Sequence, residues 1–205
     1  MNDAQEAQMT KGRLEAFSDG VIAIIITITI LLIDLPEGDK WKDLVKLLPI
    51  AGSYLISFII VGTNWANHHH LLQVVCEVNG KILWANLLYL FFLSFIPLTT
   101  GWVGRSGFAM VPVTVYVMMN LANAGSYLLL ERMIIRSSDC EVLRDAVNDH
   151  KKELWTIGIE LIALAVSFIP TVHYAACPLL VAAFAPWIIP DLRMKRVYED
   201  ARREK

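Results

Sequence analysis

Charge is nearly absent from long stretches of this 205-residue sequence. Only one charged side chain, Glu160, occurs within five segments, which are residues 20–33, 47–76, 82–104, 106–130 and 154–190. A soluble domain alternates charged and apolar residues at helical or strand spacing, because each of its elements has one wet face. This segregation of charge excludes a soluble globular domain, and a content of 56% hydrophobic residues excludes a disordered chain. The sequence therefore predicts an integral membrane protein.

Cysteine pairs are also lacking. The three cysteines are Cys76, Cys140 and Cys177, and none of them forms a C-x-x-C motif. The odd number and this spacing exclude a complete disulfide framework and a typical zinc site, so we expect unpaired structural thiols. The net charge of −2 argues against a nucleic-acid partner. The lipid bilayer is the partner that the composition favours.

The apolar segments have the length of membrane-spanning helices, which need about 20 apolar residues to cross the hydrocarbon core. We predict an all-α integral membrane protein, one domain over residues 1–205, with six spans at about 17–35, 45–66, 82–102, 108–130, 154–173 and 174–190. The six tryptophans lie near the ends of these spans, where indole rings commonly anchor a helix at the membrane interface.

The first span contains a strand-like segment, Ile-Thr-Ile-Thr-Ile at residues 26–30. β-Branched residues favour strands, but a buried strand is usually about 4–8 residues long, and this apolar run is far longer. An isolated strand in lipid would also leave its backbone N–H and C=O groups unpaired, whereas a helix pairs them internally. We therefore predict a helix.

An even number of spans places both termini on one side of the membrane. Basic residues concentrate on that side, chiefly in the N-terminal segment, in a helical connector at about 131–153 and in a basic tail at 191–205. The opposite side carries Lys40, Lys42, Lys46 and Arg105. Because positively charged loops face the cytoplasm, we expect a multi-pass protein of the cell membrane with both termini inside.

Polar residues within the spans are the candidates for function, because each is costly in lipid without a partner. Asp19 lies near the start of span one, where capping and the helix dipole are alternative explanations for an acidic residue. Span two ends in three consecutive histidines, His68 to His70, which point about 100° apart on a helix and cannot share one metal ion. We predict no metal site.

Two later spans also carry polar side chains. Asn120, Asn123 and Ser126 lie in span four, where residues of this kind often join helices by hydrogen bonds. Glu160 follows Glu153 by about two helical turns, or about 10 Å of rise. It therefore lies either just under the headgroups, which we favour, or at a proton or ion site.

The start of span one carries the motif Arg13-x-x-x-Phe17-Ser18-Asp19. This motif resembles the R-x-x-x-F-S-D signature of the transmembrane protein 175 family of potassium channels. Two further segments resemble motifs of the prokaryotic members of this family: Trp65-x-x-His68 at the end of span two and Asn86-Leu87-Leu88 in span three.

The resemblance implies a channel for K⁺ that lacks the T-V-G-Y-G filter, and no such segment occurs here. For a chain with one six-helix repeat, it implies a homotetramer with four copies of span one around the pore. K⁺ is then the permeant ion, and we expect no cofactor.

Helical geometry divides span one into faces. Four residues at spacing i, i+3, i+4 and i+7 share one face: Ile24, Thr27, Ile28 and Leu31. By the resemblance, Ile24 matches the narrow apolar ring of the pore, and apolar constrictions of this kind gate by dewetting. Thr27 is the only hydroxyl on this face. The alternative explanation of the stripe is packing against a neighbouring helix.

Asp19 lies about 140° around the helix from Ile24, and therefore faces the surrounding helices if Ile24 faces the pore. We predict that it braces the pore helix rather than binding ions. The residues predicted to form this bracing motif are Arg13, Phe17, Ser18, Asp19, Trp65, His68 and Asn86.

Two other classes of function remain as alternatives. A proton- or cation-coupled secondary transporter would use Asp19, His68 or Glu160. Such transporters often have internal repeats and helices broken by Gly or Pro, but this sequence has no internal repeat and span one has no central Gly or Pro. A membrane enzyme would need a nucleophile, metal set or acid–base pair at one depth. Nothing in the sequence marks one, so we predict that the protein is not an enzyme.

Overall fold

The structure, a computed structural model, describes residues 10–75, 77–137 and 151–188. All regular secondary structure in these ranges is helical, as predicted. The elements in chain order are α2 (Lys11–Ile30), α3 (Trp41–Val45), α4 (Leu48–Gln73), α5 (Gly80–Leu93), α6 (Phe95–Arg105), α7 (Met110–Ser137), α9 (Lys151–Ser167), the 3-10 helix η1 (His173–Ala175) and α10 (Ala176–Ile188).

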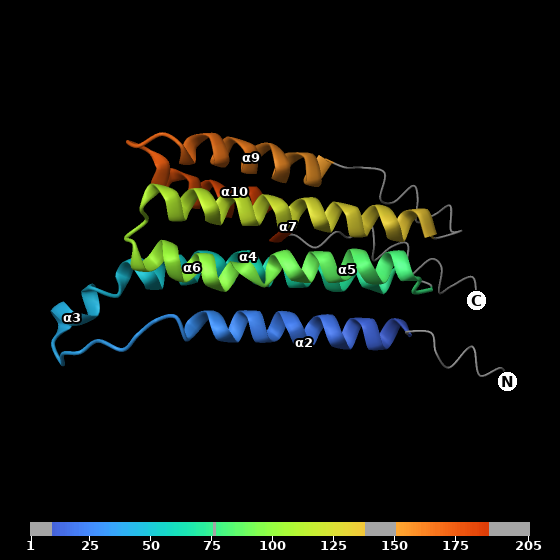
Figure 1. Cartoon of the computed structure of the whole chain (residues 1–205), viewed down its shortest axis with the longest axis horizontal. Coiled ribbons are helices and arrows are strands. Elements are labelled where there is room, and N and C mark those ends of the chain that lie inside the picture. Colours follow the sequence, from blue (N-terminus) through green and yellow to red (C-terminus); the bar gives the residue numbers. More distant parts are fainter. Residues whose placement is uncertain (1–9, 76, 138–150, 189–205) are drawn as a thin grey trace.

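The long helices lie side by side and alternate in direction along the bundle (Figure 1). α2 forms one edge, where it contacts α4, α5 and α6. α7 packs on α5 and α6, and α9 packs on α7 at the edge opposite α2. Because α2 has neighbours on one side only, part of its surface is left uncovered in the single subunit.

Among the described residues, three stretches have the length and composition of membrane spans: α4, the continuous stretch Gly80–Arg105 formed by α5 and α6, and α7. The protein is therefore a multi-pass membrane protein. α2 has 20 residues, but Lys11, Arg13, Glu15 and Asp19 lie in its first half. α9 has 17 residues and α10 has 13, fewer than the about 20 that a crossing needs. The other three of the six spans stay a prediction.

The strand-like segment at residues 26–30 is helical, as predicted. The hydroxyl of Thr27 donates to the Ala23 carbonyl at 2.9 Å, and that of Thr29 donates to the Ile25 carbonyl at 2.6 Å, so both polar side chains are satisfied within the helix. The helix ends at Ile30, before the predicted end of span one at 35, because the next backbone N–H groups turn back to carbonyls three residues earlier.

The predicted third span, 82–102, is interrupted at Ser94 between α5 and α6. Pro97 has no N–H to donate to the Leu93 carbonyl, and its ring crowds that carbonyl. Ser94 donates its own hydroxyl to the Phe91 carbonyl at 2.7 Å across the break. Of the other predicted segments, most of the connector (138–150), the tail (191–205), Cys76 and Cys140 lie outside the described residues; Cys177 is a buried free thiol.

α4, α6 and α7 are joined by close backbone packing and by hydroxyl groups. A Cβ atom at Gly104 of α6 would lie 2.7 Å from the Ile50 Cα atom of α4, so only glycine permits this approach. Ser57 Oγ lies 2.6 Å from Thr100 Oγ1 and 2.8 Å from the Tyr116 hydroxyl. These contacts hold α4, α6 and α7 together, and α2 packs against α4 and α6.

Candidate functional site: the two faces of α2

A chain of buried polar side chains joins α2, α4 and α5. Ser18 of α2, His68 of α4 and Asn86 of α5 have no exposed surface. Asn86 Nδ2 donates to Ser18 Oγ at 2.9 Å, and Asn86 Oδ1 lies 2.7 Å from His68 Nε2. Because an amide oxygen only accepts, His68 Nε2 is the donor in this bond. One asparagine thus bonds both neighbours and positions α2 against two helices.

Tyr89 extends this chain of contacts. The rings of His68 and Tyr89 stack with their centroids 5.0 Å apart and an angle of 5° between their planes. The Tyr89 hydroxyl donates to Asn64 Oδ1 at 3.3 Å, and this bond also joins α5 to α4. The sequence does not single out Tyr89, because an aromatic residue within an apolar run looks like any other core residue.

Asn123 of α7 also contacts this region. Asn123 Nδ2 donates to the Tyr89 carbonyl of α5 at 3.2 Å. Asn120 and Ser126 instead bond carbonyls of α7 itself. The expectation that span four joins helices through polar side chains therefore holds for Asn123, while the other two satisfy their own helix.

Asp19 is held by Trp65. The indole Nε1 donates to Asp19 Oδ1 at 2.9 Å, and the Trp65 side chain is 42% exposed, so this bond lies near the surface of the bundle. Trp65, His68 and Asn86 were all predicted to belong to the bracing motif. His68 and Asn86 do meet the motif, but through Ser18 rather than Asp19.

Arg13 and Phe17 are not brought into this network. Both lie on the exposed side of α2, and Arg13 forms no ion pair within the described residues. Their predicted bracing contacts are therefore not made within one subunit. Lys11, which the sequence did not single out, donates to the Gln73 carbonyl and joins the start of α2 to the end of α4.

The opposite face of α2 is apolar and uncovered. Ile24, Ile28 and Leu31 are 56%, 46% and 75% exposed, and Thr27 is exposed between them. Ile22, only two residues before Ile24, has no exposed surface. The predicted stripe therefore lies on one face, and the contacts that hold α2 lie on the other.

Glu160 lies on α9, a helix that contributes none of the residues named above. Its side chain has no exposed surface, and neither carboxyl oxygen has a hydrogen-bond partner within the described part of the chain. The carboxyl group is therefore enclosed by protein, and its location just under the headgroups stays a prediction.

Comparison with known proteins identifies the relatives of the chain. A family model described as "Endosomal/lysosomal potassium channel TMEM175" matches residues 13–97. A protein of Chryseobacterium sp. (strain P1-3) that is named as a potassium channel is 46% identical over 189 residues, which are 92% of this chain and 97% of that protein. The chain belongs to the TMEM175 family. This is a family of ion channels, and the protein is not an enzyme.

A solved structure extends the similarity to the fold. The crystal structure of a lysosomal potassium-selective channel TMEM175 homolog from Chamaesiphon minutus matches with a TM-score of 0.67 and 27% identity, over 86% of this chain and 96% of that one. The human protein named as an endosomal/lysosomal proton channel TMEM175 is 32% identical over 102 residues, 47% of this chain and 20% of that protein. Relatives in the TMEM175 family are thus named as potassium channels or as proton channels.

The part of the chain that matches the TMEM175 model contains both faces of α2 and every residue of the predicted bracing motif, from Arg13 to Asn86. α7, α9 and α10 lie outside the matched residues.

Replacing Asp19 with alanine is expected to loosen α2 from α4, because it removes the acceptor of the Trp65 indole. The bond lies near the surface, so we expect a loss of about 1 kcal/mol in the free energy of unfolding. Thermal denaturation and the assembled fraction measure this loss. Trp65→Phe, which removes the donor but keeps a ring, should have the same effect. An Asp19→Ala protein that assembles fully but prefers a different ion would contradict a bracing role.

Proposed function

We propose that the protein is a K⁺ channel of the cell membrane that conducts passively through a homotetramer, with four copies of α2 around a central pore. The observation that carries this proposal is the uncovered apolar stripe of α2, which consists of Ile24, Thr27, Ile28 and Leu31. The names of the Chryseobacterium and Chamaesiphon relatives support K⁺ as the ion.

The position of the stripe supports a pore. A large apolar residue on a membrane helix faces lipid, another helix or a pore, and α2 lies at the edge of the bundle where any of these is accessible. Four Ile24 side chains that meet at an axis would form a narrow apolar constriction, and such constrictions close by losing their water. Ile28 and Leu31 would add further rings, each about one helical turn beyond the last.

The orientation of the buried face supports the same arrangement. Hydrogen bonds at Ser18 and Asp19 set the rotation of α2 about its own axis, since both residues are tied to α4 or α5. A fixed rotation is what a pore helix needs, because a turn of one residue would replace Ile24 at the axis by a neighbour. We therefore propose that the bracing network keeps the constriction residues aligned.

We further propose that α2, α9 and α10 complete six spans with α4, α5–α6 and α7, and that both termini are cytoplasmic. The basic residues of the N-terminal segment, connector and tail support this orientation. In the tetramer, the charged first half of α2 would then lie at the cytoplasmic mouth of the pore, where water solvates the charges.

Flux from liposomes tests the proposal. Purified protein is reconstituted in KCl-loaded vesicles that are diluted into NaCl, and K⁺ efflux is followed with an ion-selective electrode; native mass spectrometry determines the subunit number. We expect K⁺ efflux without an imposed proton gradient and a complex of four chains. Efflux only when a proton gradient is imposed would favour the coupled transporter that uses Asp19, His68 or Glu160. Proton flux without K⁺ flux would contradict the choice of ion.

Replacing Thr27 with valine is expected to lower the K⁺ over Na⁺ permeability ratio. The Thr27 hydroxyl donates its hydrogen to the Ala23 carbonyl, which leaves oxygen lone pairs to replace part of the hydration shell of a cation. A difference of about 1 kcal/mol corresponds to a ratio about fivefold lower. Thr27→Ser keeps the hydroxyl and is the control. An unaltered ratio in Thr27→Val would assign selectivity to the apolar rings alone.

A further inference from the structure

A histidine joins two distant turns at the end of the bundle that carries α3. His173 lies in η1, in the turn between α9 and α10, which is found at that end (Figure 1). Its Nε2 atom lies 2.9 Å from the carbonyl oxygen of Phe108, in the turn between α6 and α7. Its Nδ1 atom lies 2.8 Å from the carbonyl oxygen of Pro170. We call the ring and these two carbonyl groups the His173 bridge.

The two acceptors of the His173 bridge favour a charged ring. A carbonyl oxygen accepts hydrogen bonds and cannot donate one, so each ring nitrogen needs a hydrogen to bond it. Neutral imidazole has a hydrogen on one nitrogen only, whereas the imidazolium cation has one on each. In the neutral form a nitrogen lone pair would face a carbonyl oxygen at 2.8 or 2.9 Å. Both bonds are therefore formed only when the ring carries a second proton.

The surroundings of the ring supply no carboxylate that pairs with it. η1 contacts α7, α9 and α10, and residues 106–130 and 161–188 contain no charged residue. In the halves of these helices on this side of the bundle, in η1 and at the end of α6, the titratable groups are Tyr116, Glu160, Cys177, Tyr174 and Arg105. Among the described residues only Tyr174 contacts the ring, edge to face with the centroids 5.8 Å apart. A phenol stays uncharged in the pH range where histidine gains a proton, so the two carbonyl groups set the preference of the ring.

The ring of His173 is accessible to protons from the water at this end. The residue is half-buried, and its neighbours Thr171, Val172 and Tyr174 are exposed. A proton can therefore enter or leave the ring without unfolding of the bundle. Histidine is the side chain that ordinarily changes its charge between about pH 5 and 8.

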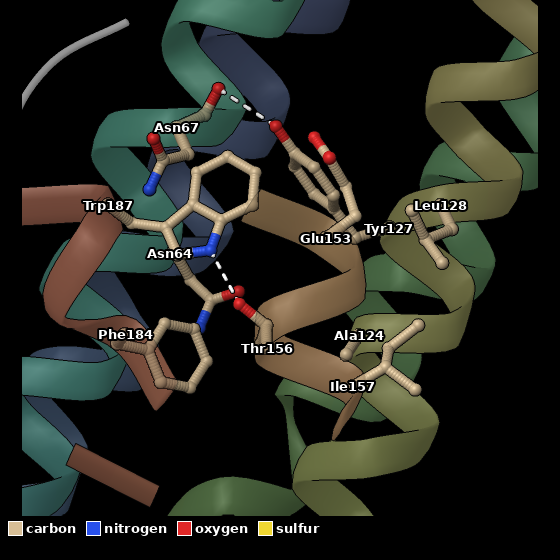
Figure 2. Close-up of a pocket in the computed structure, with 10 residues that line it drawn as sticks. All are labelled: Asn64, Asn67, Ala124, Tyr127, Leu128, Glu153, Thr156, Ile157, Phe184 and Trp187. Atoms are coloured by element: carbon tan, nitrogen blue, oxygen red, sulfur yellow. Dashed lines mark hydrogen bonds between the residues drawn. The ribbon is translucent and has the colours of Figure 1, made fainter. Parts of the chain in front are cut away.

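Two other contacts that hold α9 and α10 to α7 do not depend on a second proton. At the same end, the Thr114 hydroxyl of α7 donates to the Ser167 carbonyl of α9 at 3.2 Å. Toward the opposite end, the rings of Tyr127 in α7 and Trp187 in α10 meet edge to face with their centroids 6.0 Å apart (Figure 2). The attachment of α9 and α10 to the bundle therefore depends on pH through the His173 bridge.

We propose that His173 binds a proton that fastens the turn between α9 and α10 to the turn between α6 and α7. The folded chain then prefers the charged ring more strongly than the unfolded chain does. The bridge accordingly stabilises the protein in acid, and this stabilisation is lost as the pH rises. Under the orientation proposed above, this end faces the outside of the cell, so external acid would close the bridge. No residue of α2 takes part in it, so this proposal and the channel proposal can fail separately.

Thermal denaturation of the purified full chain at about pH 5.5 and at about pH 8 tests the proposal. His173→Gln keeps a polar side chain that cannot gain a charge. We expect it to lower the melting temperature by at least about 3 °C more at the acidic pH than at the alkaline pH, because it removes a hydrogen bond from a charged donor. An equal loss at both pH values would overturn the proposal.

Thr114→Val is the matched control, because it removes the hydrogen bond to the Ser167 carbonyl at the same end without removing a titratable group. Its loss of melting temperature should be the same at both pH values. If it instead depends on pH as strongly as the loss in His173→Gln, the effect belongs to the whole end of the bundle and the proposal is overturned.

Nitrogen-15 NMR of the wild-type protein provides a test that does not require a variant to fold. The His173 ring is assigned through its backbone neighbours in uniformly labelled protein. At about pH 6.5 a free histidine is half protonated, whereas the bridge should keep both ring nitrogens of His173 mostly protonated. A ring that is half or more neutral at this pH would overturn the proposal.

Discussion

Replacing Ile24 with asparagine is expected to increase K⁺ flux by about tenfold or more and to weaken the preference for K⁺ over Na⁺. If four Ile24 side chains form the narrowest apolar ring, the amide groups will hold water in it and lower the barrier to a hydrated ion. A barrier lowered by about 1.4 kcal/mol raises a rate tenfold. Because Ile24 is exposed on α2 and contributes little to the core, the variant should fold and assemble.

Single-channel recording in planar bilayers, with bi-ionic K⁺ and Na⁺ solutions, measures both effects. Ile30→Asn is the matched control, because Ile30 is also an exposed isoleucine of α2 but lies about 120° around the helix from Ile24. Unchanged currents in Ile24→Asn would remove this residue from the pore. Equal increases in both variants would show that any polar group on α2 loosens the assembly, and would remove the argument for a single pore-facing stripe.

Replacing Asn86 with leucine is expected to be the most damaging single change to the bracing network. Leucine has a similar size but neither donor nor acceptor, so it leaves Ser18 and His68 buried and unpaired at once. Each buried group that loses its partner costs about 1–3 kcal/mol, so we expect the free energy of unfolding to fall by about 2–6 kcal/mol. For a chain of this size the melting temperature should fall by at least about 5 °C.

Thermal denaturation and native mass spectrometry on the same preparation measure this effect and its consequence for assembly. Asn67→Leu is the control, since the Asn67 side chain donates to the Thr63 carbonyl of its own helix and, within the described part of the chain, bonds no other helix. We expect Asn86→Leu to lose assembled protein as well as stability, because α2 no longer holds its rotation. An Asn86→Leu protein as stable and as well assembled as Asn67→Leu would show that the apolar contacts of α2 suffice.

The sequence could identify most members of the buried network but not how they pair. His68 and Asn86 stand out because a polar side chain in an apolar span is costly without a partner, and Ser18 belongs to the motif at the start of span one. Arg13, Asp19 and Trp65 were all predicted to belong to the bracing motif, but nothing in the sequence shows that Asp19 bonds Trp65 while Arg13 stays outside the network. Which residue of α4 lies opposite Asp19 depends on how far α2 slides along α4, and core packing sets that register.

The sequence likewise predicts the helices but not all of their boundaries. The apolar runs predicted the helices themselves, since their backbone groups must pair internally in lipid. Pro97 lies near the end of the predicted third span, 82–102, where a missing N–H has little effect. The helical stretch in fact continues to Arg105, which places Pro97 inside it and explains the break at Ser94. Local composition could not predict this extension, because it depends on packing against α4.

The contacts of α2 hold its first half more firmly than its end. Short hydrogen bonds at Ser18 and Asp19 hold its first half. The segment after its last turn is held by Arg105, whose guanidinium lies 3.4 Å from the Leu32 carbonyl and 3.6 Å from the exposed Asp34 carboxylate. Long, solvent-exposed contacts of this kind add little stability. Amide hydrogen exchange should therefore be slowest near Ser18 and Asp19 and faster toward the end of the helix. In a tetramer, the apolar ring nearest that end would be the one that thermal motion opens most easily.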